Sequence, residues 1–137
     1  MLSRKTRYAI MALSTLAREW GGDNAVPMST IARDRHVPQR FLEGIFLQLR
    51  NASLLESVRG VSGGYRLSRP PGEISILDVI LALDEDLELI SCLDICGRAS
   101  ECEFGLDRAD CRIWPLFGEI QEHMHATLLH KTLANLI

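Results

Sequence analysis

All four cysteines of this 137-residue chain lie in one stretch of its second half. They are Cys92, Cys96, Cys102 and Cys111, with three, five and eight residues between them. Cysteine thiolates bind zinc and iron–sulfur clusters, so the grouping predicts a metal centre. Glycine, serine and acidic residues separate the cysteines without helical or strand periodicity, which predicts a loop. A loop this long needs a reason to be ordered, and a bound metal centre would supply one.

Three kinds of thiol chemistry fit this pattern. Structural zinc usually binds cysteines separated by about two to four residues, and only Cys92 and Cys96 have that spacing. We therefore favour an iron–sulfur cluster, with zinc as the alternative and redox-active thiols without metal as the third. The number of ligands alone does not decide between a 2Fe–2S and a 4Fe–4S cluster.

The remaining polar residues do not form a catalytic pattern. His123 and His125 are two residues apart in a helical segment, so they point to different sides and make no metal pair. No Ser/His/Asp or Cys/His spacing argues for catalysis, and we predict that the protein is not an enzyme. No secretory segment follows the basic start, and no apolar run approaches the ~20 residues that cross a bilayer. We therefore expect a cytoplasmic protein with reduced thiols and no membrane partner.

The small net charge of −3 hides a strong asymmetry. Residues 1–70 contain 11 lysines and arginines against 5 acidic residues, a balance of +6. Residues 71–137 contain 4 against 13, a balance of −9. Such segregation predicts a basic part that binds nucleic acid and an acidic part kept away from it, although a polarised solvated surface fits the charge equally well.

The first elements that must position these residues are helical. Residues 3–20 carry an apolar stripe at three- and four-residue steps, with Ser3 as the N-cap and a pair of glycines as the end. The stripe consists of Tyr8, Ala9, Ala12, Leu13, Leu16, Ala17 and Trp20. Basic residues in the first turn oppose the helix dipole, but they would suit a turn that faces phosphates.

Two further helices are predicted on either side of Val37-Pro38. The first covers residues 28–36, with Ser29 as its N-cap. The second covers residues 39–50, with a buried face of Phe41, Leu42, Ile45, Phe46 and Leu49. This pair matches a helix-turn-helix, whose second helix enters the major groove with its N-terminal residues leading. Those residues are Gln39, Arg40 and Glu43, whose side chains can pair with adenine, guanine and cytosine, or can simply be solvated.

A glycine-rich hairpin follows. Residues 54–58 and 65–68 are predicted strands, joined by Arg59-Gly-Val-Ser-Gly-Gly64. Glycines in so short a connection allow positive φ and close approach to another surface. The hairpin has the shape of a wing, in which Ser62 and backbone amides contact phosphates and Arg59 probes the minor groove. A nucleotide-binding loop is excluded because Lys-Ser/Thr does not follow the glycines.

Two more helices are predicted in the second half. After a Pro-Pro-Gly linker, Ser75 caps a helix from Ile76 to about Leu83, with Asp78 at the capping-box position. Beyond Cys111 a helix of roughly 20 residues carries a continuous apolar stripe that a second subunit would cover. The stripe consists of Ile113, Leu116, Phe117, Ile120, Met124, Thr127, Leu128 and Leu133. A two-fold dimer would read a pseudo-palindromic operator in double-stranded DNA.

Nearly the whole chain resembles the Rrf-type winged helix-turn-helix regulators, the group of IscR-, NsrR-, RirA- and CymR-like proteins. The resemblance rests on L-S-R-K-T-R-Y-A-I-M-A-L, S-T-I-A, F-L-E-G-I-F-L-Q-L-R, V-R-G-V-S-G-G-Y-R-L, L-D-E-D and C-R-I-W. It implies a mainly α fold with a small β-hairpin wing and a long C-terminal dimerisation helix. The predicted domains are 1–70 for DNA binding, 71–91 as a connection, 92–111 for the cluster and 112–137 for dimerisation.

The resemblance also implies the site residues. By position Cys92, Cys102 and Cys111 match the cysteines of the family, whereas Cys96 is extra and Trp114 stands where IscR-like members carry a histidine. We therefore expect either four cysteine ligands or three and one exogenous or unidentified ligand. A 2Fe–2S cluster is favoured from the family, and 4Fe–4S stays open. The expected DNA contacts are Ser3, Lys5, Thr6, Ser29, Gln39, Arg40, Glu43, Arg50, Arg59, Ser62, Gly63, Gly64 and Tyr65.

Overall fold

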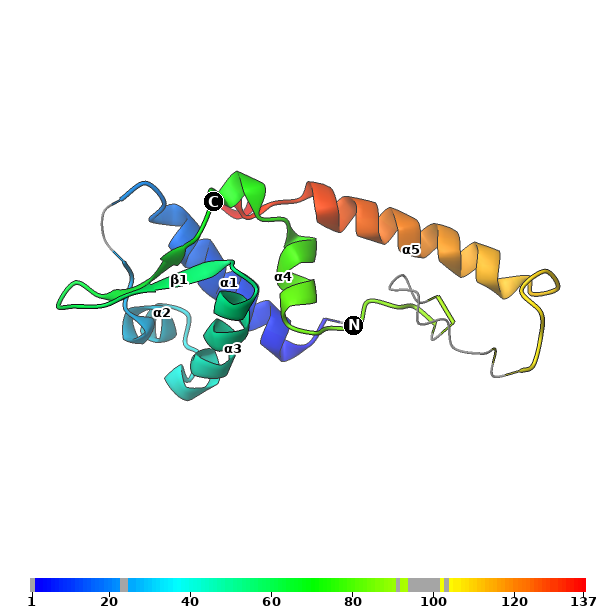
Figure 1. The fold of residues 1–137 in the computed structure, drawn as a ribbon, viewed down its shortest axis with the longest axis horizontal. Helices are drawn as coiled ribbons and strands as arrows, with labels where there is room; N and C mark the ends of the chain where they lie inside the picture. Colours follow the sequence, from blue (N-terminus) through cyan, green and yellow to red (C-terminus); the bar gives the residue numbers. More distant parts are fainter. Residues whose placement is uncertain (1, 23–24, 91, 94–101, 103) are drawn as a thin grey trace. The chain divides into compact units, whose positions relative to one another are not determined.

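The computed structural model describes residues 2–22, 25–90, 92–93, 102 and 104–137 (Figure 1). The chain forms two compact units, Met1–Glu85 with Leu128–Ile137, and Asp86–Thr127. These units divide the chain differently from the predicted domains, because the helix after the wing and the C-terminal segment pack with the N-terminal elements. Within the described ranges, the helices are all too short or too polar to cross a membrane.

The first unit is built on α1 (Arg4–Arg18), α2 (Met28–Asp34) and α3 (Gln39–Asn51). Ser3 is the N-cap of α1, as predicted, and its side-chain oxygen accepts a hydrogen bond from the Thr6 amide. The apolar faces of the three helices make a common core, because each carries its apolar residues at helical spacing. The largest fully buried side chains of this core are Leu13, Ile31, Leu42, Ile45, Phe46 and Leu49.

Three predictions for these helices are wrong. Ser29 does not cap α2, because the helix begins one residue earlier and Pro27 occupies the N-cap position. Trp20 lies beyond the end of α1 and is 43% exposed. Phe41 is also 43% exposed, because it stands at the edge of the α3 apolar face, where its ring contacts Tyr8 edge-on at 5.6 Å between centroids.

The wing consists of β1 (Leu55–Val58) and β2 (Gly64–Leu67), paired antiparallel. Tyr65 fixes the wing to the rest of the unit, since its N–H and C=O each form a 2.9 Å hydrogen bond with the backbone of Val26. The Tyr65 ring also packs edge-on against Phe46 of α3, at 4.9 Å between centroids. The wing is therefore held against the helix that the sequence predicts to enter the major groove.

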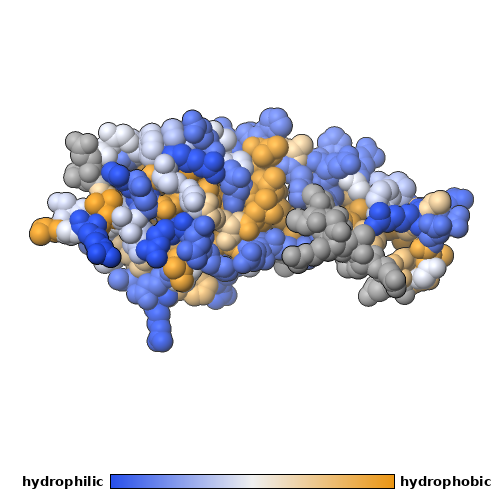
Figure 2. Space-filling view, viewed as in Figure 1, coloured by the Kyte–Doolittle hydropathy of each residue, from blue (hydrophilic) through white to orange (hydrophobic). Residues whose placement is uncertain are grey.

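The chain continues through η1 (Pro71–Glu73) and α4 (Ile76–Ala82), and the C-terminal η2 (Leu133–Leu136) lies beside them. The Leu133 N–H donates to the Ile74 carbonyl at 3.0 Å, and the Leu133 side chain is fully buried. Leu133 therefore belongs to this core, and not to the apolar stripe of the last helix as predicted. Figure 2 shows an apolar stripe over α4. Leu81 of this helix is 51% exposed.

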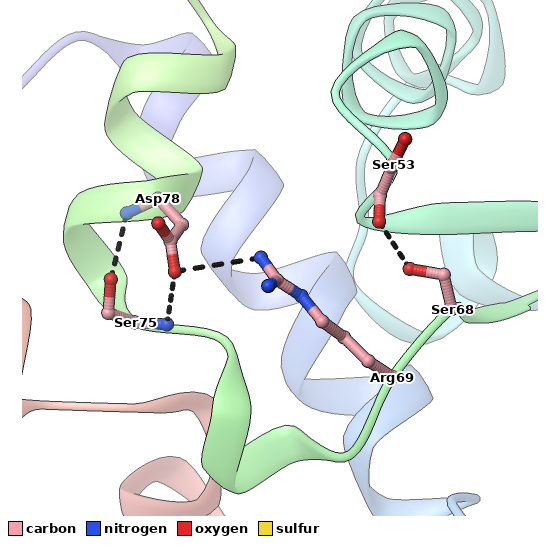
Figure 3. A network of polar contacts seen from close by, with 5 residues as sticks. All are labelled: Ser53, Ser68, Arg69, Ser75 and Asp78. Carbon is pink, nitrogen blue, oxygen red and sulfur yellow. Dashed lines mark hydrogen bonds and ion pairs between the residues drawn. The ribbon is translucent and has the colours of Figure 1, made fainter.

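The predicted capping box at the start of α4 is confirmed (Figure 3). The Ser75 hydroxyl accepts from the Asp78 amide at 3.0 Å, and the Asp78 carboxylate accepts from the Ser75 amide at 2.9 Å. The same carboxylate lies 3.8 Å from the Arg69 guanidinium. Ser68 donates to the Ser53 carbonyl, which ties the end of the wing to the turn after α3. Short polar contacts thus fix the exit from the wing.

The N-terminus of α1 is hydrogen-bonded to the turn that follows α4. The Ser3 hydroxyl donates to the Glu85 carboxylate, and the Lys5 ammonium donates to the Leu83 carbonyl at 3.2 Å. Asp84 in this turn has a positive φ of 55°. The Ser3 hydrogen bond holds the pKa of Glu85 below its ordinary value, although burial opposes this shift. The turn after α4 is thereby attached to the start of the chain.

Replacing Gly64 by alanine should destabilise the protein. A Cβ at Gly64 would lie 2.4 Å from backbone atoms of Val26, and the residue has φ +155°. We expect Gly64→Ala to lower the free energy of unfolding by at least about 1 kcal/mol in urea denaturation. Gly44→Ala, on α3 with open space around it, is the control and should raise that energy by about 0.5–1 kcal/mol. Equal stability of Gly64→Ala and wild type would contradict the docking of the wing.

Glu85 should make stability depend on pH. Because its pKa in the folded protein lies below its ordinary value of 4.5, its contribution is present above that pH and is lost as the pH falls through the folded-state pKa. The difference in unfolding free energy between wild type and Glu85→Gln should therefore shrink between about pH 5 and about pH 3. Glu73→Gln, at an exposed carboxylate of η1, is the matched control. A pH-independent difference for Glu85→Gln would refute the Ser3 contact.

Candidate metal centre and nucleic-acid interface

Three of the four cysteines line one cavity in the second unit. The cavity has a volume of about 340 Å³, and its lining consists of Cys92, Cys102, Leu106, Asp107, Arg108, Cys111 and Trp114. The three thiols are free and half-buried. Cys96 lies outside the described residues. Cysteines separated by up to 19 positions in the sequence therefore line one cavity in the fold of this unit.

Gln121 positions the cavity wall that contains Cys92. Gln121 belongs to α5 (Ile113–His130) and is only 2% exposed. Its side-chain oxygen accepts from the Leu89 amide at 3.0 Å, and its side-chain nitrogen donates to the Leu93 carbonyl at 2.8 Å. These two bonds hold the backbone on both sides of Cys92 against the helix. Sequence reasoning missed Gln121, because a glutamine in an amphipathic helix is usually exposed.

The third cysteine stands at the beginning of α5. Cys111 lies two residues before the helix, and its sulfur accepts a hydrogen bond from the Trp114 backbone N–H at 3.4 Å. Free N–H groups at a helix N-terminus stabilise negative charge, and a metal-binding cysteine must be a thiolate. The helix start therefore offers a backbone hydrogen bond to the sulfur of Cys111.

Trp114 contributes a second feature to the same cavity. Arg108 lies over its ring, with the guanidinium carbon 5.5 Å from the ring centroid. The indole nitrogen Nε1 is buried and has no hydrogen-bond partner among the described residues. A buried donor without an acceptor costs about 1–3 kcal/mol. The cavity is therefore lined by three thiols and an arginine, and the Trp114 side chain in its lining has a buried N–H that donates to no described residue.

The chemistry of this donor set fits a sulfur-ligated metal centre. Thiolates are the ligands of iron–sulfur clusters and of many zinc sites, and the neighbouring N–H groups and the guanidinium would offset their negative charge. In the described ranges, no three Cys, His, Asp or Glu side chains are close enough together to hold a metal ion. The described cysteines thus share a cavity without converging on one point.

The predicted nucleic-acid contacts on α3 lie on its exposed side. Gln39, Arg40 and Glu43 are exposed at the N-terminal end of the helix, while the opposite face is buried in the core. Arg50 is exposed near the C-terminal end. Figure 2 shows a mostly hydrophilic surface over α2, α3 and the wing. These side chains are therefore free to contact a groove or a phosphate.

The arginines of the first unit fall into two classes. Arg35 donates to Thr15 at 2.7 Å, Arg66 forms an ion pair with Glu56 at 2.5 Å, and Arg69 is paired in the capping-box network. Arg33 forms an ion pair with the neighbouring Asp34 at 3.4 Å. The exposed arginines that form no ion pair with any residue that the structure describes are Arg4, Arg7, Arg18, Arg40, Arg50 and Arg59. The unpaired class is the one available for phosphates, and it includes every arginine among the predicted DNA contacts.

The wing residues that were predicted to contact DNA differ in how exposed they are. Arg59 and Ser62 are exposed at the turn, and Val61 between them is fully exposed. Gly63 and Gly64 are half-buried, and a Cβ on either would meet backbone atoms at 2.4–2.5 Å. Their role in this fold is to let the hairpin close and dock.

Most of the predicted DNA contacts at the N-terminus are buried or hydrogen-bonded within the protein. Thr6 is fully buried, so its side chain cannot reach a phosphate, and we remove it from the set of DNA contacts. Ser3 and Lys5 are half-buried and bonded to the turn after α4. Ser29 is exposed within α2 and stays a candidate. The basic residues Arg4 and Arg7 are the exposed ones at this end.

The sequence matches known transcriptional regulators along its whole length. Residues 2–137 match the Rrf2 family, described as an iron-dependent transcriptional regulator. An rrf2-like HTH-type transcriptional regulator of Rhodobacter capsulatus is 37% identical over 122 residues, which cover 88% of this chain and 81% of that protein. The HTH-type transcriptional regulator IscR of Photobacterium profundum is 32% identical over 136 residues, covering 99% of this chain and 74% of that protein.

Solved structures give the same result. The global cysteine regulator CymR of B. subtilis superposes with a TM-score of 0.79 at 26% identity, covering 99% of this chain and 95% of that one. IscR of T. potens gives 0.77 at 26% identity, covering 99% and 85%. These relatives are regulators and not enzymes, and the predicted fold class is confirmed. The chain therefore belongs to the Rrf2 family of winged helix-turn-helix transcriptional regulators.

Proposed function

We propose that the protein is a homodimer whose affinity for an operator is set by an iron–sulfur cluster bound to Cys92, Cys96, Cys102 and Cys111. The observation that carries this proposal is the single cavity lined by three half-buried free thiols. The description of the family as iron-dependent favours iron over zinc. A reduced cytoplasmic setting would keep these thiols available.

The cluster would supply a centre that responds to iron supply, oxidation or nitric oxide. The residues that hold the cysteine-bearing backbone would respond to the state of this centre. Gln121 holds the backbone around Cys92, and the start of α5 holds Cys111, so both ends of the cysteine stretch depend on one helix. Ligation in the cavity would fix the segment between them, and loss of ligation would release it.

DNA recognition would follow from the exposed side of α3 and from the wing. Gln39, Arg40 and Glu43 would face base edges in the major groove. Arg59 would enter the minor groove, and Ser62 would contact a phosphate. The packing of Tyr65 against Phe46 holds the wing beside α3. Both surfaces would then contact the same half-site.

A second copy of the chain would cover the apolar side of α5. Ile113, Leu116 and Ile120 follow each other at helical spacing and are 55%, 57% and 47% exposed. A row of large apolar side chains with so much exposure is typical of an interface. Two-fold pairing would place two α3 helices on a pseudo-palindromic operator.

The link between the cavity and the DNA contacts would run through Glu85. The second unit begins at the next residue, Asp86. Glu85 and Leu83 are hydrogen-bonded to Ser3 and Lys5, which frame the exposed Arg4. A change in the second unit that pulls on this turn would therefore change the position of a basic helix end.

The cysteines provide the first test. Each cysteine is replaced by serine, and iron, sulfide and the absorbance at about 300–450 nm are measured on protein purified without air. Operator affinity is measured on DNA selected by the wild-type protein from a random library. Loss of a ligand should remove iron and change that affinity by roughly 5–150-fold. Ser100→Ala, in the same stretch, is the control and should change neither.

Three outcomes would count against the proposal. Colourless wild-type protein with stoichiometric zinc would favour a zinc-stabilised regulator. Protein free of metal, with DNA affinity that responds to thiol oxidation, would favour a thiol-based regulator. Iron that stays bound after all four single substitutions would exclude the cavity as its site.

The wing provides the second test. Arg59→Ala should weaken operator binding roughly tenfold and lower the slope of log affinity against log salt by about 1, because one unpaired guanidinium is lost from the DNA. Arg66→Ala is the matched control, since it removes a guanidinium of the same hairpin that is already paired with Glu56. Equal effects of the two substitutions would contradict the assignment of Arg59 to DNA.

A further inference from the structure

Trp114 joins three features of the cysteine cavity. Its backbone N–H donates to the Cys111 sulfur at 3.4 Å. Its ring lies under Arg108, whose guanidinium carbon is 5.5 Å from the ring centroid. Its indole Nε1 is buried without a hydrogen-bond partner in the described part of the chain. Both Trp114 and Arg108 line the cavity together with the thiols.

A buried donor of this kind requires an acceptor. Buried polar groups in native proteins are nearly always hydrogen-bonded, and an exception calls for an explanation such as a missing ligand. A phenylalanine would fill the same space without an N–H to satisfy. The acceptors that the proposed function brings to this cavity are sulfur atoms, as cysteine thiolates and as the sulfide of a cluster.

We propose that the indole N–H of Trp114 donates a hydrogen bond to a sulfur of the centre held in this cavity, and that Trp114 and Arg108 together raise its reduction potential. The inference rests on the proposed function. Trp114 acts as a positioning residue and not as a ligand, because indole nitrogen is a donor only.

The direction of the shift in reduction potential follows from charge. Reduction adds an electron to a centre that thiolates already make negative. A hydrogen-bond donor and a nearby guanidinium both stabilise the more negative state, so both favour the reduced form. Stacking on the Trp114 ring keeps the otherwise exposed Arg108 beside the cavity. Removing either group should therefore make reduction harder.

The experiment compares wild type, Trp114→Phe, Arg108→Gln and Trp20→Phe, each reconstituted without air with ferrous iron and sulfide. Reduction potentials are measured by spectroelectrochemistry, and iron release is followed with a chelator. Trp114→Phe should shift the potential to a more negative value and lower the affinity for iron about tenfold. Arg108→Gln should shift the potential in the same direction. Trp20→Phe replaces the other tryptophan, which lies in the first unit, and should change neither quantity.

A second readout covers the case in which Trp114→Phe fails to bind a cluster. In Trp20→Phe protein the sole indole is Trp114, and its fluorescence should be quenched as iron and sulfide are added. Unchanged emission in that titration, or an unchanged potential in Trp114→Phe with full iron and sulfide, would overturn the inference and leave the proposed function intact. Wild-type protein that binds no iron and sulfide would overturn both.

Discussion

The hydrogen bond between Ser3 and Glu85 joins the start of the DNA-binding unit to its last residue before the cysteine-bearing unit begins. The rest of the proposed mechanism depends on this attachment, because the chain leaves the first unit at that point. Ser3 has two roles here, since it also caps α1 through the Thr6 amide. A displacement of Glu85 would therefore alter the N-cap of α1, and not merely a free chain end. Caps contribute about 1 kcal/mol, which is comparable to the coupling energies of regulatory switches.

Some arginines of the first unit have a partner within the protein, and others have none among the described residues. Guanidinium groups that neutralise a carboxylate or bind a hydroxyl, such as Arg66 and Arg35, lie where they fasten the wing and α2. Those without a partner in the described part of the chain, such as Arg40 and Arg59, lie on exposed helix and turn positions. An excess of positive charge alone gives only non-specific attraction to DNA. The unequal pairing of these arginines indicates which of them a phosphate or base can recruit without breaking the fold.

Local patterns in the sequence predicted most of the fold. The apolar spacing of α1 and α3, the capping box of Ser75 and Asp78, and the glycine-rich turn of the wing each depend on residues a few positions apart. The errors concern contacts between distant segments. Phe41 satisfies the helical spacing of a buried residue, yet the core is complete without it. The burial of Gln121 and of the Trp114 indole N–H could not be predicted from the sequence, because it depends on the segment that folds against α5.

Among the residues that the structure describes, the second unit has no apolar core like that of the first. In its described part, Leu93 and Gln121 are the buried residues, and Gln121 is polar. The apolar side chains of α5 are mostly exposed, so they stabilise the unit only when another surface covers them. A segment with so little buried apolar area opens at low free-energy cost and responds readily to a bound group. Ligation by thiolates can supply several kcal/mol to such a segment, far more than one packed methyl group. Under the proposed function, ligation of the cysteines would therefore stabilise this unit, which is the property that a cluster-controlled regulator requires.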